Sequence, residues 1–140
     1  MIYLAQTDTT AGFLSKDLKA LNSLKQRDIN KACLITTAKF SELKKLTRVP
    51  NKFKNTIRKA KKTTFLYPNA KAIRVVKDCA HEKFLKEFDW LYSTSANLHE
   101  KKFDEKWAIQ RADIVVDKVF FESSASKIFK LRDTRKIKLR

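Results

Sequence analysis

Short runs of small polar and basic residues follow the apolar segments of this chain. One such run, Tyr92 to Asn97, holds four hydroxyl side chains and ends in an amide, directly after an apolar pair. Lys25 and Arg27 stand two residues apart at the end of a leucine-spaced segment. Hydroxyls, amides and cations are the groups that bind phosphate or carboxylate oxygens. This residue set predicts an anion-binding site at the ends of strands and helices.

Each of these features also has a purely structural explanation. A Lys-x-Arg pair at a helix end complements the helix dipole, and a Ser-x-Asn run makes a turn. The polar run from Gln6 to Gly12 has a similar alternative, because Thr and Asp side chains commonly cap helices. The residues by themselves therefore leave two interpretations open, a binding site and ordinary capping.

Other kinds of catalytic site find little support in the sequence. The chain has a single glycine, which is incompatible with a P-loop or a glycine-rich dinucleotide fingerprint. His81 and His99 have no cysteine or carboxylate partners at metal-ligand spacing, and Cys33 and Cys79 lie far apart. We therefore expect no protein-bound metal and two buried free thiols.

Net charge is the strongest compositional feature. The 140 residues carry a formal charge of +17. Residues 39–62 hold ten basic residues and one acid, and residues 127–140 hold seven basic residues and one acid. Such a field attracts polyanions and gives salt-dependent affinity for nucleic acid. We expect Lys59, Lys61 and Lys62 to contact RNA, and a lysine-rich surface without any nucleic-acid partner is the alternative.

The candidate residues need a scaffold, and strand-like and helix-like patterns alternate along the chain. We expect strands at residues 1–5, 32–36, 63–67, 72–76, 90–94 and 113–117, with one or two edge strands in the tail. We expect helices at residues 15–26, 42–46, 51–62, 81–88 and 104–112, with Ser15 and Ser41 as N-caps. A Pro68-Asn69 turn favours a hairpin. The pattern predicts one α/β domain over residues 1–140 with a mixed sheet.

The sequence shows neither a membrane helix nor a secretion signal. No window approaches the roughly 18 consecutive apolar residues that a membrane helix needs. The N-terminus lacks the charged start and long apolar run of a signal peptide. The apolar fraction of 43% is that of a globular protein. We therefore expect a cytoplasmic protein with no membrane partner.

Taken together, the polar motifs resemble those of the YrdC-like family, the threonylcarbamoyl-AMP synthases. TDTTAGF, followed by the leucine-spaced helix and LKQR, resembles the family opening T-D-T-x-Y-G-L and I-K-x-R. TSANL resembles the motif T-S-A-N-x-S-G. TTFLY with AIRVV resembles the central T-[FL]-x-[LF] and V-R-x-P stretch, and SKIFKL with IKLR resembles the closing segment. The four matches occur in family order and span nearly the whole chain.

This resemblance implies a YrdC-like twisted mixed sheet flanked by helices, with a basic concave face. It implies an enzyme that condenses L-threonine, bicarbonate and ATP, with Mg²⁺, into threonylcarbamoyl-adenylate and pyrophosphate. The adenylate would serve threonylcarbamoyladenosine (t6A) modification of tRNA. The implied partners are tRNA or double-stranded RNA and other tRNA-modification proteins.

The resemblance also assigns roles to residues of this chain. Lys25 and Arg27 would be catalytic and would contact the ATP phosphates. The further residues that would bind ATP are Ser95, Asn97, Ser126 and Arg140. Thr7 and Thr64 would hold L-threonine.

The sequence departs from the family pattern at several motif positions. Ala11 replaces the motif tyrosine, Asp28 follows Lys-x-Arg in place of proline, and Val76 replaces the proline of V-R-x-P. A Lys-Lys pair replaces the Pro-Gly before the central threonine, and the last motif glycine is lost near Glu100. The alternative function is therefore a non-catalytic module of the same fold that binds double-stranded RNA or tRNA. A ribosome-associated basic protein is a third interpretation.

Overall fold

The computed structural model describes residues 1–98 and 100–140, which cluster into two compact units. Unit 1 consists of Met1–Cys33 and Leu91–Ser124, and unit 2 consists of Leu34–Trp90 and Ala125–Arg140. The expectation of a single domain over residues 1–140 stays a prediction. His99, considered above as a metal ligand, lies outside the described residues.

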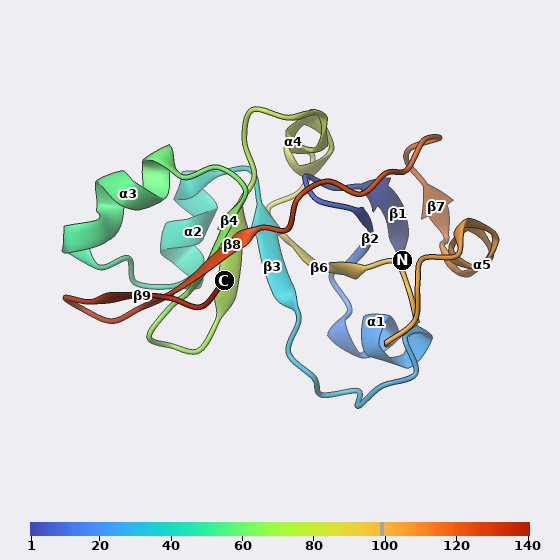
Figure 1. Cartoon of the computed structure of the whole chain (residues 1–140), viewed down its shortest axis with the longest axis horizontal. Coiled ribbons are helices and arrows are strands. Elements are labelled where there is room, and N and C mark those ends of the chain that lie inside the picture. Colours follow the sequence, from blue (N-terminus) through green and yellow to red (C-terminus); the bar gives the residue numbers. More distant parts are fainter. Residues whose placement is uncertain (99) are drawn as a thin grey trace. The chain divides into compact units, whose positions relative to one another are not determined.

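Unit 1 holds four strands and two helices in its described part. The strands are β1 (Tyr3–Gln6), β2 (Ala11–Ser15), β6 (Leu91–Ser95) and β7 (Ile114–Val115). They pair in the order β7-β1-β2-β6, with β1 parallel to β7 and β2 antiparallel to both β1 and β6. The helices are α1 (Leu18–Leu24) and α5 (Glu105–Arg111). Figure 1 shows α5 beside β7.

The core of unit 1 joins both helices to the strands. Leu4 on β1, Phe13 on β2 and Leu21 on α1 are fully buried in one cluster. Trp107 of α5 meets the Phe13 ring edge-on, with the ring centroids 5.8 Å apart. Burying side chains of this size stabilises a fold by about 1.5–3 kcal/mol each. These contacts hold α1 against the strands that carry the polar motifs.

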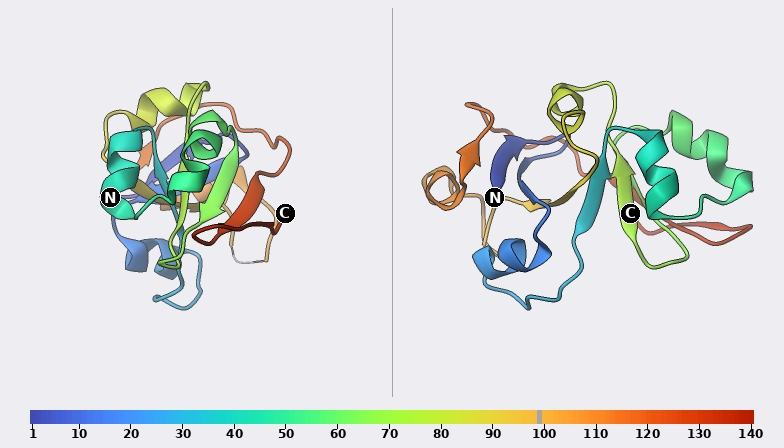
Figure 2. Two further views of the ribbon diagram at one scale, coloured as in Figure 1. Left: turned by 90° about the vertical axis from the view of Figure 1, so that its left-hand side faces the viewer. Right: turned by 180° about the vertical axis from the view of Figure 1, so that it is seen from behind.

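Unit 2 holds the other described elements. Its strands are β3 (Leu34–Thr37), β4 (Thr63–Leu66), β5 (Ala72–Val75), β8 (Lys127–Leu131) and β9 (Lys136–Lys138). They pair in the order β3-β5-β4-β8-β9, with β3/β5 and β4/β8 parallel and β4/β5 and β8/β9 antiparallel. The helices are α2 (Phe40–Leu46), the 3₁₀ turn η1 (Asn51–Phe53), α3 (Lys54–Lys59) and α4 (Ala80–Leu85). Figure 2 shows α2 beside α3.

The α/β prediction with a mixed sheet is confirmed, because both units contain parallel and antiparallel strand pairs. The hairpin around Pro68-Asn69 is also confirmed, with Phe65 opposite Ile73. The helix predicted over residues 51–62 is shorter and divided into η1 and α3. None of the helices in the described residues combines the length and apolarity that a bilayer crossing requires.

Both predicted N-caps are wrong. Asp17 caps α1, since its Oδ1 accepts a hydrogen bond from the Ala20 amide. Ser15 is the last residue of β2, and its Oγ accepts the Asp17 amide. Ser41 lies inside α2, which begins at Phe40 without a side-chain cap.

One strand, β2, was missed in the run predicted to be loop and cap. All five of its residues are buried, so the alternation of apolar and polar side chains that marks a half-exposed strand is absent. The polar loop is consequently shorter than predicted and consists of residues 7–10 between β1 and β2.

Gly12 on β2 is required by close packing rather than by its backbone conformation. A Cβ atom at this position would lie 2.7 Å from Cγ2 of Thr7 and 3.3 Å from the Thr94 carbonyl oxygen. Thr7 resists movement, because its Oγ1 donates a hydrogen bond to the Thr10 carbonyl oxygen at 2.6 Å. We expect Gly12→Ala to lower the free energy of unfolding by about 1–3 kcal/mol, the range for overpacking. Urea melts measure this, and an unchanged midpoint would contradict it.

Candidate anion-binding site

The turn that ends α1 determines where Lys25 and Arg27 lie. Gln26 has a φ of 56°, in the left-handed region, and its amide donates to the Ser23 carbonyl oxygen. The Arg27 amide donates to the Asn22 carbonyl oxygen at 3.1 Å. These two bonds form a Schellman motif, in which glycine usually occupies the position of Gln26. From this turn, both cationic side chains reach β6.

Lys25 contacts the end of β6 and is only 3% exposed. Its Nζ donates to the Ser95 carbonyl oxygen at 2.8 Å. The same Nζ lies 3.2 Å from Ser95 Oγ and 3.4 Å from Asn97 Oδ1. Lys25, Ser95 and Asn97, which come from two separate motifs, are therefore in direct contact. All three oxygens are neutral, so they orient the ammonium without cancelling its charge.

Burial changes the protonation of this lysine. Loss of hydration, followed by the positive charge of Arg27, lowers the pKa of Lys25 from 10.5 to about 8. Between about pH 8 and 10.5 the unfolded chain therefore binds more protons at Lys25 than the folded protein does. The contribution of Lys25 to folding stability consequently becomes more favourable as the pH rises through this window.

We expect the affinity of this site for ATP to fall as the pH rises through about 8. Below that pH the Lys25 side chain is a cation. Above it the Lys25 side chain is a neutral amine, and Arg27 alone of these two residues carries a positive charge. The expected loss between about pH 7.5 and pH 9 is roughly 3- to 8-fold, because a lysine with a pKa of about 8 is already partly deprotonated at pH 7.5. Calorimetric titration measures it. Lys25→Met is the control. If the ATP affinity of Lys25→Met depends on pH as strongly as that of the wild type, Lys25 is not the source of the pH dependence.

Arg27 is half-buried and is held by three uncharged groups. Its Nε donates to Asn22 Oδ1 at 2.7 Å, and one Nη donates to Cys33 Sγ at 3.0 Å and Thr94 Oγ1 at 3.3 Å. Asn22 is itself fully buried, and its Nδ2 donates to two carbonyl oxygens in the loop at residues 29–31. Asn22 therefore fixes the orientation of the guanidinium.

Asn22 and Cys33 were not among the predicted site residues. A signal existed for Asn22, which lies four residues after Leu18 and three before Lys25 on the face that α1 buries. Cys33 and Cys79 are free thiols as predicted, but both are half-buried rather than buried.

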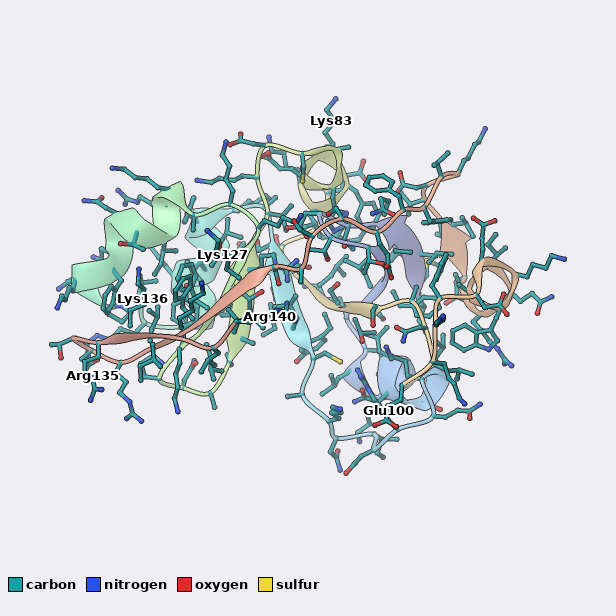
Figure 3. The ribbon with its side chains drawn as sticks, in the orientation of Figure 1. Lys83, Glu100, Lys127, Arg135, Lys136 and Arg140 are labelled. Carbon is teal, nitrogen blue, oxygen red and sulfur yellow. The ribbon has the colours of Figure 1, made fainter. Side chains whose placement is uncertain are left out.

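The other candidate residues of the second half of the chain meet in unit 2. Ser126 is 2% exposed, and its Oγ accepts hydrogen bonds from the Arg74 and Arg140 guanidinium groups, both at 2.8 Å. Arg74 also donates to Thr64 Oγ1 at 3.0 Å. Arg140 lies beside β8 (Figure 3) and donates through Nε to the Ser126 carbonyl oxygen. Buried Arg74, which was not among the predicted site residues, thus links Thr64 to Ser126.

Thr7, predicted to bind threonine, has its hydroxyl engaged in the turn between β1 and β2. Thr7 Oγ1 donates to the Thr10 carbonyl oxygen and accepts the amides of Thr9 and Thr10. Capping of this turn therefore accounts for Thr7, and its role in threonine binding stays a prediction.

The residues predicted to bind RNA lie at the end of α3 and just beyond it. Lys59 and Lys61 are exposed, and Lys62 is half-buried with a φ of 54°. Lys61 forms an ion pair with Asp78 at 3.1 Å, which reduces its charge toward a ligand. Lys59 is therefore the residue of this set best placed for a phosphate.

A pocket of about 740 Å³ in unit 1 includes Ser95 and Asn97 in its wall. The remainder of the wall combines aromatic and charged groups, namely Phe103, Phe120, Phe121, Lys101, Lys102 and Glu122, with Thr10, Ala11 and Ala96. This volume lies in the range of small-molecule sites. Aromatic rings suit a nucleobase, and the lysines and hydroxyls suit phosphates.

Comparison with solved structures identifies the fold. A double variant of P. abyssi Sua5 shares 18% identity with this chain at a TM-score of 0.82, over 99% of this chain and 52% of that one. P. abyssi Sua5 complexed with L-threonine shares 17% identity at a TM-score of 0.76, over 99% of this chain and 49% of that one. E. coli YciO shares 15% identity at a TM-score of 0.75, over 99% of this chain and 82% of that one. This chain therefore spans about half the length of the Sua5 chains that it matches.

Identities this low establish the fold alone, and the chain has the YrdC-like fold that the motifs predicted. Neither a protein-family model nor a curated protein matches the sequence. The basic concave face implied by the resemblance stays a prediction.

Proposed function

We propose that this chain binds ATP through Lys25, Arg27, Ser95 and Asn97 and uses it to make threonylcarbamoyl-adenylate for t6A modification of tRNA. The observation that carries this proposal is the burial of the Lys25 ammonium against Ser95 and Asn97. A lysine is almost never buried without a partner for its charge. The contacts given above are with neutral oxygens, and an anionic ligand would supply a counter-charge.

The proposed chemistry is electrostatic. The amine of L-threonine attacks the carbon of bicarbonate, a C–O bond breaks and water leaves, which gives a carbamate. A carbamate oxygen then attacks the α-phosphorus of ATP and displaces pyrophosphate. Negative charge builds on the phosphate oxygens during this step, and preorganised cations stabilise such charge most effectively. Lys25 and Arg27 supply these cations, and the Asn22 contact holds the guanidinium in place beforehand. No side chain needs to act as a covalent nucleophile.

Mg²⁺ enters this proposal as part of the nucleotide substrate. Among residues 1–98 and 100–140, no three His, Cys, Asp or Glu side chains gather at metal-binding distance. The groups around Lys25 are hydroxyls, amides and cations, whereas Mg²⁺ prefers carboxylate and phosphate oxygens. The ion would therefore be held by the ATP phosphates, and no step is assigned to a protein-bound metal.

Two observations support L-threonine as the amino-acid substrate. One solved structure of the same fold is Sua5 complexed with L-threonine. In this chain Thr64 lies next to the buried Arg74, whose guanidinium is a suitable partner for a carboxylate. We propose Thr64 and Arg74 as threonine contacts within the polar cluster of unit 2, which also contains Ser126 and Arg140. ATP binding by Ser126 and Arg140 stays a prediction.

The experiment that tests the proposed reaction is an omission series for pyrophosphate release. We expect release with ATP, L-threonine and bicarbonate together and none when any one of them is left out. Release from ATP alone would indicate a different nucleotide hydrolysis. ATP binding without release would leave a nucleotide-binding module and contradict the synthase.

A non-catalytic module that binds double-stranded RNA or tRNA is the second candidate function, favoured by the +17 charge. We expect RNA affinity to fall steeply with salt, with a log–log slope of about −4 to −5 for roughly six phosphate contacts. Replacing Lys59, Lys61 and Lys62 by alanine should flatten this slope by about 1–3, since each lost contact contributes about 0.7–0.9. Anisotropy titrations over a salt series measure it.

Lys83 provides the matched control for these lysines. It is exposed on α4 and projects away from the ribbon in Figure 3. Lys83→Ala should change the log–log slope by less than about 0.9, the contribution of one phosphate contact. A wild-type slope near zero would remove nucleic acid as a partner.

A further inference from the structure

A second pocket, of about 570 Å³, lies in unit 2 and is lined by residues of α2, η1 and α3 and of the loop between α2 and η1. Figure 1 shows α2 beside α3. Its floor is apolar and consists of buried Leu43 and Ile57 with half-buried Phe40 and Val49. No lining residue belongs to the sets proposed above for ATP, threonine or RNA. The volume is that of a small-ligand site, and the proposed reaction leaves it unexplained.

The rim of this pocket is strongly cationic. Four exposed cations line it, namely Lys44, Arg48, Lys54 and Arg58. None of the lining residues is acidic, and the nearby acid Glu42 is buried and paired with Lys45 at 3.0 Å. Positive charge around an apolar floor selects a ligand with an apolar part and several negative charges.

An unpaired nucleotide in an RNA strand has this chemistry. In an RNA duplex the bases are stacked inside, so a duplex would use the cationic rim and leave the apolar floor empty. The Lys77 ammonium lies over the Phe40 ring, 5.9 Å from its centroid. A splayed base can place its face on the floor and on the part of the Phe40 ring that lines the pocket, while the flanking phosphates meet Arg48 and Arg58.

Lys44 lies on α2, Lys54 and Arg58 lie on α3, and Arg48 lies in the loop after α2. Four cations exceed the need of a single phosphate. A strand with a phosphate on each side of the base uses them fully.

We propose that this pocket captures one unpaired nucleotide of an RNA strand, with its base on the apolar floor and its flanking phosphates on the cationic rim. The proposal rests on the RNA binding proposed above and names the part of the RNA that is recognised. Lys59 ends α3, the helix that contributes Lys54 and Arg58 to the rim. The strand would therefore continue from the pocket onto the proposed phosphate contacts.

Three fluorescent probes test this proposal at one low salt concentration. The first is an unstructured oligoribonucleotide of about ten nucleotides, within the site sizes known for single-strand binding. The second has the same backbone with abasic sugars in place of the bases. The third is a blunt duplex of the same length. We expect the first probe to bind at least about fivefold more tightly than the abasic strand, because base stacking on aromatic side chains has effects of this size.

Two sets of variants assign the preference to this pocket. Phe40→Leu keeps an apolar side chain of similar size and should remove most of the preference for bases, whereas Phe88→Leu is the control. Phe88 is also a half-buried phenylalanine of unit 2, but it does not line the pocket.

The second set tests the cationic rim. The double variant Arg48→Gln with Arg58→Gln should weaken the binding of both the normal and the abasic strand. The control is Lys19→Gln with Lys83→Gln, which removes the same charge from exposed positions elsewhere and should weaken binding less. Thermal melts show whether each variant is folded.

The outcomes separate this proposal from the proposed function. Equal binding of the normal and abasic strands, tighter binding of the duplex, or a preference that Phe40→Leu leaves intact would overturn the pocket and leave RNA binding standing. Phosphatidylglycerol vesicles serve as a fourth probe, and their binding in place of the strand would overturn the pocket in favour of a lipid site. No binding of any probe would overturn both RNA proposals. A base preference without pyrophosphate release would support the pocket and contradict the synthase.

Discussion

Arg27→Ala is expected to lower the rate of adenylate formation by about 100- to 1000-fold, the effect of removing one preorganised donor from developing charge. ATP affinity should fall by about 1.5–3 kcal/mol, the range for a charge-assisted hydrogen bond. The size of both effects follows from the position of the guanidinium, which Asn22 and Thr94 hold before any ligand binds. Steady-state kinetics and calorimetric titration of ATP measure them.

Three further variants distinguish a phosphate contact from a helix cap. Arg27→Lys should recover only part of the loss, because an ammonium cannot make a forked contact. Asn97→Ala should cost less, about 0.5–1.5 kcal/mol of ATP affinity, as a neutral hydrogen bond does. Arg111→Ala removes the same charge from an exposed position of unit 1 and should leave ATP affinity unchanged. If Arg27→Ala changes the melting temperature but leaves ATP affinity unchanged, Arg27 stabilises the C-terminal end of α1 and binds no phosphate.

Asn22→Ala is expected to lower the free energy of unfolding by about 2–4 kcal/mol. The side chain is fully buried, and its loss would leave two loop carbonyl oxygens and the Arg27 Nε without their partner. An unsatisfied polar group costs about 1–3 kcal/mol when it is buried, and because Ile29 and Lys31 lie in an exposed loop, water recovers part of the sum. Urea melts measure the change, with Asn55→Ala on the exposed face of α3 as a control expected within about 0.5 kcal/mol of the wild type.

Asn22 also links stability to binding, since Arg27 depends on it for orientation. Where Asn22→Ala still folds, its ATP affinity should fall toward that of Arg27→Ala, and the double variant should be no weaker than Arg27→Ala alone. Fully additive losses would show that Asn22 stabilises the loop without positioning the guanidinium.

Much of the fold was predictable because its strands and helices follow local patterns. The strands on either side of Pro68-Asn69 are rich in β-branched and aromatic residues and have a turn between them, and β4 and β5 pair there. β2 was not predictable in this way, because all five of its residues are buried and no exposed face reveals the strand. The cap of α1 was misplaced by two residues, since Ser15 and Asp17 are both good N-caps and the end of β2 decides between them.

The candidate site was predictable as a set of residues but not as a geometry. Lys25 and Ser95 lie 70 residues apart, and they meet because α1 packs on β2 and β2 pairs with β6. The spacing of Lys25 from Leu18 and Leu21 places it on the buried face of α1, but a lysine there can extend its ammonium into solvent, so the spacing does not indicate that the ammonium is buried. The lowered pKa of Lys25 follows from that burial. The contact of Arg27 with Asn22 was equally hidden, because it depends on the left-handed residue Gln26.

Incorporation of labelled carbon from bicarbonate into a threonine-containing adenylate is the most direct measurement of the proposed reaction. The wild-type chain, Arg27→Ala and Arg111→Ala would be incubated with ATP, Mg²⁺, L-threonine and labelled bicarbonate, and the products separated by chromatography. We predict a labelled threonylcarbamoyl-adenylate with wild type and Arg111→Ala, and about 100- to 1000-fold less with Arg27→Ala. No labelled adenylate from folded wild-type protein that binds ATP, or equal amounts from wild type and Arg27→Ala, would contradict synthesis at this site.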